Sequence, residues 1–365
     1  MKILIATNHS YMFYRFRKEL VGALMQEHEV ILSTPFVGHE DDLQAMGLRC
    51  IETDIDRRSI NPFKDMKLLG TYRQMLVELQ PDMVVTYSIK PNIYMGTACK
   101  AKGIPYVANV QGLGTAFEKP VLSSVVSVMY HSALRKAKTV FFENEENAQF
   151  FLNKKIISDR QVRVLPGAGI NLDEYPCVPM QDDGVCSFLF VGRIMKEKGV
   201  DEVFSAAKTL KAEFGEQVAF DVVGFYEDAY KEQVDGLVAD GIVRFHGFQT
   251  DVHPFYEAAD CVVLPSYHEG MSNVLLEGAA TGRALITSDI PGCREAVKDG
   301  ISGYLCPAQD AERLTCAMRD FARQSFERQA QMGQSGRALV EHKFDKQLVV
   351  AKTLDGLGLP AAVRS

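Results

Sequence analysis

Short hydrophobic runs alternate with longer amphipathic stretches from the first residues of the chain. The runs "KILIAT", "EVILSTP", "DMVVTYS" and "PYVANVQ" are rich in Val and Ile, and stretches such as "YRFRKELVGALMQE" and "MKLLGTYRQMLVELQ" separate them. Buried strands that alternate with helices of this length indicate βαβ units and a mostly parallel sheet. The first half of the chain is therefore predicted to be α/β.

The alternation is interrupted at residues 171–185. This segment, "NLDEYPCVPMQDDGV", is polar, contains two prolines and shows no period, which is typical of a linker. The alternation resumes with "CSFLFVGRI" and continues to "SGYLCP". We therefore predict two Rossmann-like, doubly wound domains facing a central cleft, residues 1–170 and 186–344, and a C-terminal helix at about 345–365 that packs back on the first. Open parallel sheets bind ligands at the carboxyl ends of their strands, so the site is expected in the cleft.

Composition excludes several classes of protein. The net charge of −7 argues against general binding of nucleic acid. There is no run of about 18 apolar residues, and "MKILIATNHS" resembles a first strand rather than a signal peptide. The eight cysteines are scattered without metal-ligand spacing, which predicts reduced thiols in a cytosolic protein and no metal site. The glycine motifs of dinucleotide-binding dehydrogenases and of P-loop ATPases are both missing, so hydride transfer and ATP hydrolysis are disfavoured.

Two cations follow a buried strand in the second half. The segment "FLFVGRIMKEKGVD" sets Arg193 and Lys198 in the loop before a helix, and Gly192 and Gly199 let the backbone approach a ligand closely. A guanidinium and an ammonium in one loop can bind the two phosphates of a diphosphate. The alternative is a pair of solvated loop charges. Their position at the carboxyl end of a strand favours the binding role.

Two glutamates, Glu269 and Glu277, lie eight positions apart in "SYHEGMSNVLLEGAATG". Ser272 or Asn273 is a natural N-cap for the helix that carries Glu277, and the loop before it offers free backbone N–H groups to an anion. Carboxylates accept hydrogen bonds from hydroxyls, so a sugar nucleotide fits, with Glu277 on the ribose diol and Glu269 on the transferred sugar. The alternative is a solvated helix face, which the apolar neighbours of Glu277 make less attractive.

These motifs resemble a known family. Residues 186–305 are similar to the nucleotide-binding half of the family 4 retaining glycosyltransferases, which adopt the GT-B architecture. The resemblance rests on "VGRIMKEKGVDEVFSAA", "VVG", "FHGF" and "DCVVLPSYHEGMSNVLLEGAATGRALITSDIPGCREAVKDGISGYL". It extends over nearly the whole chain through "VQGLGTAF", "FFENEENAQFF" and "LPGAGINLDEY". The chain looks most like bacterial enzymes that build surface polysaccharides or lipid-linked oligosaccharides.

The resemblance implies residue roles in both halves. It implies catalytic roles for Arg193, Lys198 and Glu269. The implied donor contacts are Gly192, Gly224, Phe248, Gly270, Met271, Ser272, Asn273, Val274 and Glu277. On the acceptor or cleft side the candidates are Asn8, His9, Gln111 and His131, although a structural or surface role is the favoured reading of His9 and His131.

The chain also departs from the family in two places. Asn8, His9 and Ser10 stand where many members have a glycine-rich turn after the first strand. Gln111 stands where many have a histidine, so no catalytic histidine is carried over. Contacts to the donor phosphates from the first domain, and the residue that assists deprotonation, are therefore left open.

The expected reaction moves a hexose, an N-acetylhexosamine or a uronate from a UDP-sugar to a hydroxyl of a lipid-linked saccharide, with retention of configuration. Glu269 is expected to bind the donor sugar rather than to attack it, and the two cations are expected to replace a metal, so no cofactor is implied. The alternatives are a non-hydrolysing UDP-sugar epimerase and a non-catalytic subunit that binds sugar nucleotides. Release of UDP that depends on an acceptor separates the three.

Membrane contact is a further expectation. Residues 119–138 combine a stripe of Val, Leu and Met with Arg135, Lys136 and Lys138, which suits a polyprenyl-diphosphate acceptor held at the lipid headgroups. An ordinary buried helix with a basic end fits these residues equally well. We expect a cytoplasmic protein that lies peripherally on the inner face of the cell membrane.

Overall fold

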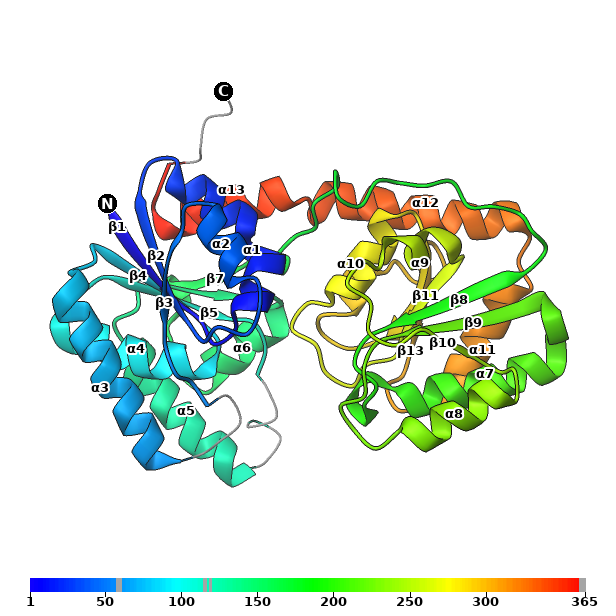
Figure 1. Cartoon of the computed structure of the whole chain (residues 1–365), viewed down its shortest axis with the longest axis horizontal. Coiled ribbons are helices and arrows are strands. Elements are labelled where there is room, and N and C mark those ends of the chain that lie inside the picture. The colour runs from blue at the N-terminus through cyan, green and yellow to red at the C-terminus, as the bar shows by residue number, and fades with distance from the viewer. Residues whose placement is uncertain (57–60, 114–116, 118–119, 361–365) are drawn as a thin grey trace. The chain divides into compact units, whose positions relative to one another are not determined.

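The computed structural model describes residues 1–56, 61–113, 117 and 120–360, and the chain divides into two compact units (Figure 1). Unit 1 is Met1–Ala168 together with Gln347–Ser365, and unit 2 is Gly169–Lys346. The segment predicted as a linker, residues 171–185, contains no helix or strand and belongs to unit 2.

Unit 1 contains a seven-stranded parallel sheet in the order β3-β2-β1-β4-β5-β6-β7. The strands are β1 (Lys2–Ala6), β2 (Glu29–Thr34), β3 (Arg49–Glu52), β4 (Met83–Tyr87), β5 (Tyr106–Val110), β6 (Thr139–Phe142) and β7 (Val162–Val164). The helices are α1 (Ser10–Met25), α2 (Glu40–Ala45), α3 (Pro62–Leu79), α4 (Ile89–Lys102), α5 (Pro120–Leu134), α6 (Glu145–Asn153) and α13 (Lys346–Leu357), with a short 3₁₀ turn, η2 (Asp159–Gln161). The strand order reverses between β1 and β4, which is where open sheets of this kind bind ligands.

Helices cover both faces of this sheet, so β4, β5 and β6 are buried along their whole length. One apolar cluster joins the sheet to α3, α4 and α5, and a second joins its other face to α1 and α13. The C-terminal helix is held closely: Lys138 Nζ donates to the Leu357 carbonyl oxygen at 2.9 Å, and a Cβ on Gly356 would lie 2.4 Å from the Phe141 ring. Helix α13 is thus an integral layer of unit 1. It is shorter than the predicted range of about 345–365, of which residues 361–365 lie outside the described residues.

Unit 2 contains a six-stranded parallel sheet in the order β10-β9-β8-β11-β12-β13. The strands are β8 (Cys186–Val191), β9 (Val218–Val223), β10 (Arg244–Phe245), β11 (Cys261–Leu264), β12 (Ala284–Ser288) and β13 (Gly303–Cys306). The helices are α7 (Val200–Phe214), α8 (Lys231–Ala239), α9 (His253–Ala258), α10 (Asn273–Ala280), α11 (Ala311–Ala322) and α12 (Phe326–Lys343). Three 3₁₀ turns complete it: η3 (Lys196–Lys198), η4 (Gly215–Gln217) and η5 (Arg294–Ala296). Figure 1 shows α7, α8 and α11 on one side of the sheet and α9, α10 and α12 on the other.

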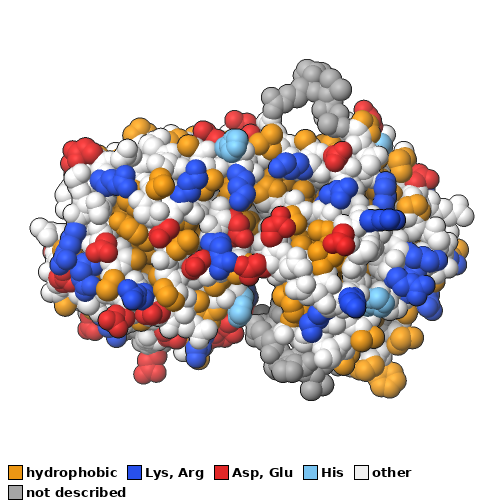
Figure 2. Space-filling model, turned by 180° about the vertical axis from the view of Figure 1, so that it is seen from behind, with side chains coloured by type: hydrophobic (Ala, Val, Ile, Leu, Met, Phe, Trp, Pro, Cys, Tyr) orange, Lys and Arg blue, Asp and Glu red, His pale blue; other side chains and the backbone are white. Residues whose placement is uncertain are grey.

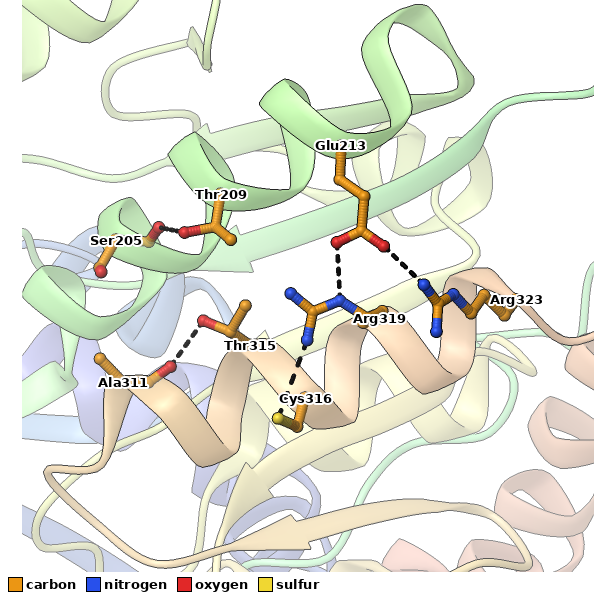
Figure 3. A network of polar contacts seen from close by, with 8 residues as sticks. All are labelled: Ser205, Thr209, Glu213, Ala311, Thr315, Cys316, Arg319 and Arg323. Carbon is orange, nitrogen blue, oxygen red and sulfur yellow. Dashed lines mark hydrogen bonds and ion pairs between the residues drawn. The ribbon is translucent and has the colours of Figure 1, made fainter.

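An ion-pair clamp joins two of these covering helices (Figure 3). The Glu213 carboxylate on α7 accepts from Arg319 Nε and from Arg323 Nη2 at the end of α11, each at 2.7 Å. The hydrogen bond from Arg319, with the charges of both guanidinium groups, lowers the pKa of Glu213. With its faces covered in this way, the sheet of unit 2 leaves the loops at its strand ends available for ligands.

Charged side chains of both signs are interspersed over the face shown in Figure 2. All eight cysteines are free thiols. Over the part of the chain that the structure describes, no helix has the length and apolar character needed to cross a membrane. Within the same residues, no group of three or more His, Cys, Asp or Glu side chains is arranged to hold a metal ion.

Candidate active site

Four loops line the carboxyl edge of the sheet in unit 2, in an order set by the strands. Because β10, β9, β8 and β11 are consecutive neighbours, the loops after them carry Phe248, Phe225, Arg193 and Glu269 in that spatial order. Neighbouring strands lie about 4.8 Å apart, so these loops extend over roughly 15 Å. The edge therefore presents aromatic rings, then a cation, then a carboxylate.

Glycines bring the first three of these loops into contact. A Cβ on Gly224 would lie 1.7 Å from the carbonyl oxygen of Gly192, so no other residue fits at position 224 without moving the backbone. The Gly192 N–H donates to the Val223 carbonyl oxygen and the Gly224 N–H donates to the Gly247 carbonyl oxygen, each at 2.9 Å. The loops predicted to contact the donor thus form one connected backbone surface.

Lys198 and Glu269, predicted separately from two motifs, form an ion pair. Lys198 Nζ donates to Glu269 Oε1, and the buried Ser266 Oγ donates to the same oxygen at 2.8 Å. Gly199 makes this approach possible: its φ is +72°, and a Cβ there would lie 2.2 Å from the Pro265 carbonyl oxygen. The sequence identified both charged residues but gave no sign that they pair or that Ser266 joins them.

Arg193 makes a separate and weaker contact. Its Nη1 lies 3.8 Å from Glu227 Oε2, and its side chain is 44% exposed. Although the Glu227 side chain is only 18% exposed, a separation of 3.8 Å is too long for a hydrogen bond, so this contact holds the guanidinium weakly. Arg193 can therefore release Glu227 and bind a phosphate with little loss of free energy.

Glu277 is buried in α10, and its carboxylate is held by a residue that sequence reasoning missed. The hydroxyl of the fully buried Tyr256 donates to Glu277 Oε2 at 2.8 Å. Tyr256 is fixed in turn, because Arg283 Nε donates to its carbonyl oxygen at 2.8 Å. A buried carboxylate is costly without such donors. No local signal could have found Tyr256, since it reaches Glu277 from the neighbouring helix α9.

The remaining donor-side candidates surround the start of α10. Ser272 is the N-cap, and its Oγ accepts from the Leu275 N–H at 3.4 Å, and Thr281 is the C-cap. A Cβ on Gly292 would lie 2.4 Å from the Gly270 carbonyl oxygen, so the loop before α10 is closely packed. Met271 is buried, and Asn273 and Val274 are half-buried.

The two phenylalanines at the other end of the edge are exposed. Phe248 is 54% exposed and Phe225, which the sequence did not single out, is 44% exposed. Their ring centroids are 6.1 Å apart with the rings edge to face. Large apolar side chains are usually buried, so an exposed aromatic pair at the carboxyl edge indicates a contact surface for a ligand.

In unit 1, three of the four acceptor-side candidates follow strands at the carboxyl edge. Asn8 Oδ1 accepts from Ser88 Oγ at 2.8 Å, which joins the loops after β1 and β4 at the point where the strand order reverses. His9 caps α1, its Nδ1 accepting from the Met12 N–H at 3.5 Å, and Gln111 directly follows β5. His131 is exposed near the C-terminal end of α5, and its Nδ1 lies 2.9 Å from the Lys155 carbonyl oxygen. The structure therefore groups Asn8, His9 and Gln111 at one edge and sets His131 apart from them.

Two parallel-sheet units, with cations and carboxylates at the carboxyl edge of the second, are the arrangement expected of the GT-B fold. Family models identify it further: the model for glycosyl transferases group 1 matches residues 186–324, and a glycosyl transferase 4-like model matches residues 2–144. The two matches together cover most of the chain. The chain belongs to this glycosyltransferase family, which confirms the resemblance, the fold class and the enzyme class expected from the sequence.

Two individual relatives are likewise named as glycosyltransferases. The chain is 27% identical over 334 residues to the N,N'-diacetylbacillosaminyl-diphospho-undecaprenol alpha-1,3-N-acetylgalactosaminyltransferase of Campylobacter jejuni, covering 86% of this chain and 88% of that one. It is 27% identical over 279 residues to the UDP-Gal:alpha-D-GlcNAc-diphosphoundecaprenol alpha-1,3-galactosyltransferase of Escherichia coli, covering 72% and 71%.

A solved structure shares the fold over the full length. The structure of HepE from Anabaena in complex with UDP and glucose matches with a TM-score of 0.79, at 15% identity, over 98% of this chain and 99% of that one. This likeness extends the fold assignment to both units.

Proposed function

We propose that the protein transfers a sugar from a UDP-sugar to a hydroxyl of a saccharide linked through diphosphate to a polyprenyl lipid, with retention of configuration. The observation that carries the proposal is the order of groups along the edge of unit 2: aromatic, cationic, then carboxylate. A UDP-sugar likewise has its base, diphosphate and sugar in that order, with the ribose between the base and the diphosphate. The two relatives named for transfer to diphosphoundecaprenol-linked saccharides support the acceptor class.

On the donor side, each part of the nucleotide has a candidate partner. Phe225 and Phe248 offer apolar ring surface to the base, and Glu277 offers carboxylate oxygens to the ribose diol. Arg193, Lys198 and the N-terminus of α10 bind the diphosphate. Glu269 accepts hydrogen bonds from hydroxyls of the transferred sugar, beside the ammonium that already neutralises it.

In the proposed reaction, the bond between carbon 1 of the sugar and the diphosphate oxygen breaks, and UDP departs with the electron pair. The acceptor hydroxyl bonds to carbon 1 on the same face, and its proton passes to the departing phosphate oxygen. Arg193 and Lys198 neutralise the charge that develops there; a preorganised donor of this kind contributes about 3–4 kcal/mol. Glu269 binds the sugar and forms no covalent bond to it, and with both cations in place the step needs no metal.

The outward face of α5 supports our further proposal that the protein contacts a membrane peripherally. Val125 and Val128, one turn apart, are 51% and 69% exposed, and the exposed Arg135 and Lys136 follow the helix. Residue 119 of the segment considered above lies outside the described residues. An exposed apolar stripe with a basic end suits an anionic lipid surface. The protein would then work on the cytoplasmic face of the membrane, where its lipid-linked acceptor lies.

Acceptor-dependent release of UDP tests the proposal. The purified protein is given UDP-hexoses, UDP-N-acetylhexosamines and UDP-uronates, each with and without a diphosphoundecaprenol-linked mono- or disaccharide. Release that requires the acceptor supports the proposal. Conversion of a UDP-sugar to its epimer without any acceptor would instead support the epimerase alternative, and binding without turnover would support a non-catalytic subunit.

A further inference from the structure

A cavity of about 280 Å³ lies in unit 2 at the amino edge of the sheet, the edge opposite the candidate active site. Its lining includes Cys186 and Val218, the first residues of β8 and β9, and Asp260, which directly precedes β11. Residues 181–185, at the end of the predicted linker, also line it. Strand β8 has six residues, so the two edges of the sheet lie roughly 20 Å apart. We call this space the amino-edge cavity.

Two buried side chains present hydrogen-bond acceptors to the amino-edge cavity. Asp260 is 7% exposed, and its Oδ2 accepts from the Ser187 N–H at 2.8 Å, whereas its Oδ1 accepts from none of the described residues. Gln329 is 6% exposed, and its Nε2 donates to the Phe321 carbonyl oxygen at 2.9 Å, whereas its Oε1 likewise has no donor among the described residues. Neither oxygen is fully enclosed. Buried acceptors are normally satisfied, so this pair suits a ligand that brings its own donors.

The charge around the amino-edge cavity is negative. Three carboxylates line it, those of Asp182, Asp183 and Asp260, and none of its described lining residues is Lys, Arg or His. Burial raises the pKa of Asp260 to about 6, and the nearby charges of Asp183 and Asp182 add to the rise. Arg283 opposes that rise, but its guanidinium donates to backbone carbonyl oxygens of α9. A cation among the three carboxylates would therefore relieve their mutual repulsion.

Aromatic side chains also line the amino-edge cavity. Phe214 at the end of α7 and Phe326 at the start of α12 are both half-buried there. Aromatic ring faces attract cations and pack against methylene groups. The guanidinium of Arg323 already lies 5.9 Å from the centroid of Phe214, where Glu213 neutralises its charge (Figure 3). The lining thus matches a ligand that has ammonium groups for the carboxylates and a short aliphatic chain for the rings.

We infer that the amino-edge cavity binds a small aliphatic amine with two or three ammonium groups. Pockets for drug-sized ligands measure about 300–1,000 Å³, so a cavity of about 280 Å³ suits a short diamine or triamine rather than a nucleotide. A metal ion is disfavoured, because no group of three or more His, Cys, Asp or Glu side chains in the described part of the chain is arranged to hold one. The inference does not depend on the sugar-transfer reaction, since the cavity lies at the other edge of the sheet.

Isothermal titration of the whole chain with spermidine tests the inference, at about pH 8 so that Asp260 is ionised. We expect saturable binding of one spermidine per chain. The diamine 1,4-diaminobutane should also bind. The diol 1,4-butanediol has the same carbon chain without charge and should not bind, because it cannot neutralise the carboxylates.

Three substitutions locate the binding. Asp260→Asn keeps the size of the side chain and an acceptor for the Ser187 N–H, and it should weaken spermidine binding about tenfold or more, as expected when a charge-assisted contact is lost. Asp182→Asn should also weaken binding, with little risk to the fold because Asp182 is exposed. Asp240→Asn is the matched control, since it removes the same charge from an exposed position at the end of α8 and should leave binding unchanged.

The inference is overturned if the unmodified protein binds no spermidine, or if 1,4-butanediol binds as tightly as 1,4-diaminobutane. It is also overturned if Asp260→Asn and Asp182→Asn bind spermidine as tightly as Asp240→Asn does, because binding would then reflect only the net negative charge of the chain.

Discussion

The two carboxylates of the proposed donor site are held by different kinds of partner. Glu269 is paired with the ammonium of Lys198 and accepts from Ser266, whereas Glu277 accepts from the neutral hydroxyl of Tyr256. A charge pair neutralises the carboxylate, but a single hydrogen bond mainly orients it. The two residues should therefore respond differently when their partners are removed.

Tyr256→Phe should weaken UDP binding by about twofold to tenfold, which corresponds to one hydrogen bond of about 0.5–1.5 kcal/mol. The ring stays, so the main loss is the 2.8 Å contact to Glu277 Oε2, together with a longer contact of 3.4 Å to the Val274 carbonyl oxygen. If that contact aims the carboxylate at the ribose diol, the advantage of UDP over 2′,3′-dideoxy-UDP should shrink in the variant. Isothermal titration with both ligands measures this. Tyr106→Phe, which removes a buried hydroxyl bonded to the Ala133 carbonyl oxygen in unit 1, should leave both affinities unchanged.

Lys198→Ala should lower the transfer rate by roughly 10²–10³-fold, as expected when one essential charge-stabilising donor is lost. Glu269→Gln should lower the rate but leave UDP affinity nearly unchanged, because its contact is to the transferred sugar. Since the two side chains form one ion pair, the double variant should lose much less than the product of the single losses. Steady-state rates and UDP titrations on the three variants measure this. Fully multiplicative losses would mean that the pair does not act as a unit.

Asp260→Asn should remove a pH dependence of stability. Burial raises the pKa of Asp260 from 3.8 to about 6, against the lowering effect of the Ser187 N–H, which donates to Oδ2 at 2.8 Å. The folded state thus binds this proton more tightly than the unfolded state, so stability falls as the pH rises from about 4 to 6, by up to about 3 kcal/mol. Urea unfolding at several pH values should show that the unmodified protein loses stability relative to the variant over this window. Parallel curves for the two proteins would contradict the prediction.

Individual elements show which features the sequence could predict. The alternation of strands and helices was readable because parallel strands covered on both faces are continuous apolar runs. The N-cap Ser272 and the burial of Glu277 were also readable, from cap chemistry and from the apolar neighbours in α10. The roles of Tyr256 and Ser266 could not be predicted, because each contacts its glutamate only once the helices and loops have packed together. The order of the strands in the sheet places Phe225 beside the predicted site residues, and no local sequence pattern predicts that order.

Gly199→Ala should damage both stability and rate, because it disturbs the turn that positions Lys198. The new Cβ would lie 2.2 Å from the Pro265 carbonyl oxygen, in addition to the strain of a φ of +72°. Gly103→Ala is the matched control, since Gly103 has the same φ of +72° in the left-handed region and nothing lies within 4 Å of the added atom. Both variants should lose about 1 kcal/mol or more of stability, but only Gly199→Ala should also lose rate. Thermal unfolding and a transfer assay distinguish them, and equal rates in the two variants would contradict a role for this turn.

For the whole molecule, we predict sugar transfer without a metal ion, because the proposed site places positive charge of its own at the diphosphate. Two cations and the amides of α10 are available to the diphosphate, so the transfer rate in excess EDTA should stay at about half or more of the untreated rate. The measurement is a transfer assay after dialysis against the chelator. Complete loss of activity that Mg²⁺ or Mn²⁺ restores would show that the diphosphate needs a divalent ion.

The C-terminal helix has a consequence for how the molecule is made. Unit 1 begins the chain, but its layer α13 comes after all of unit 2, residues 169–346. A ribosome that adds about 5–20 residues per second therefore needs roughly 10–40 s between finishing the sheet of unit 1 and supplying its last helix. During that interval the face around Phe141, where Gly356 later lies, is open to water or to a chaperone. The sheet of unit 1 is thus made before unit 2, but unit 1 is completed only after unit 2.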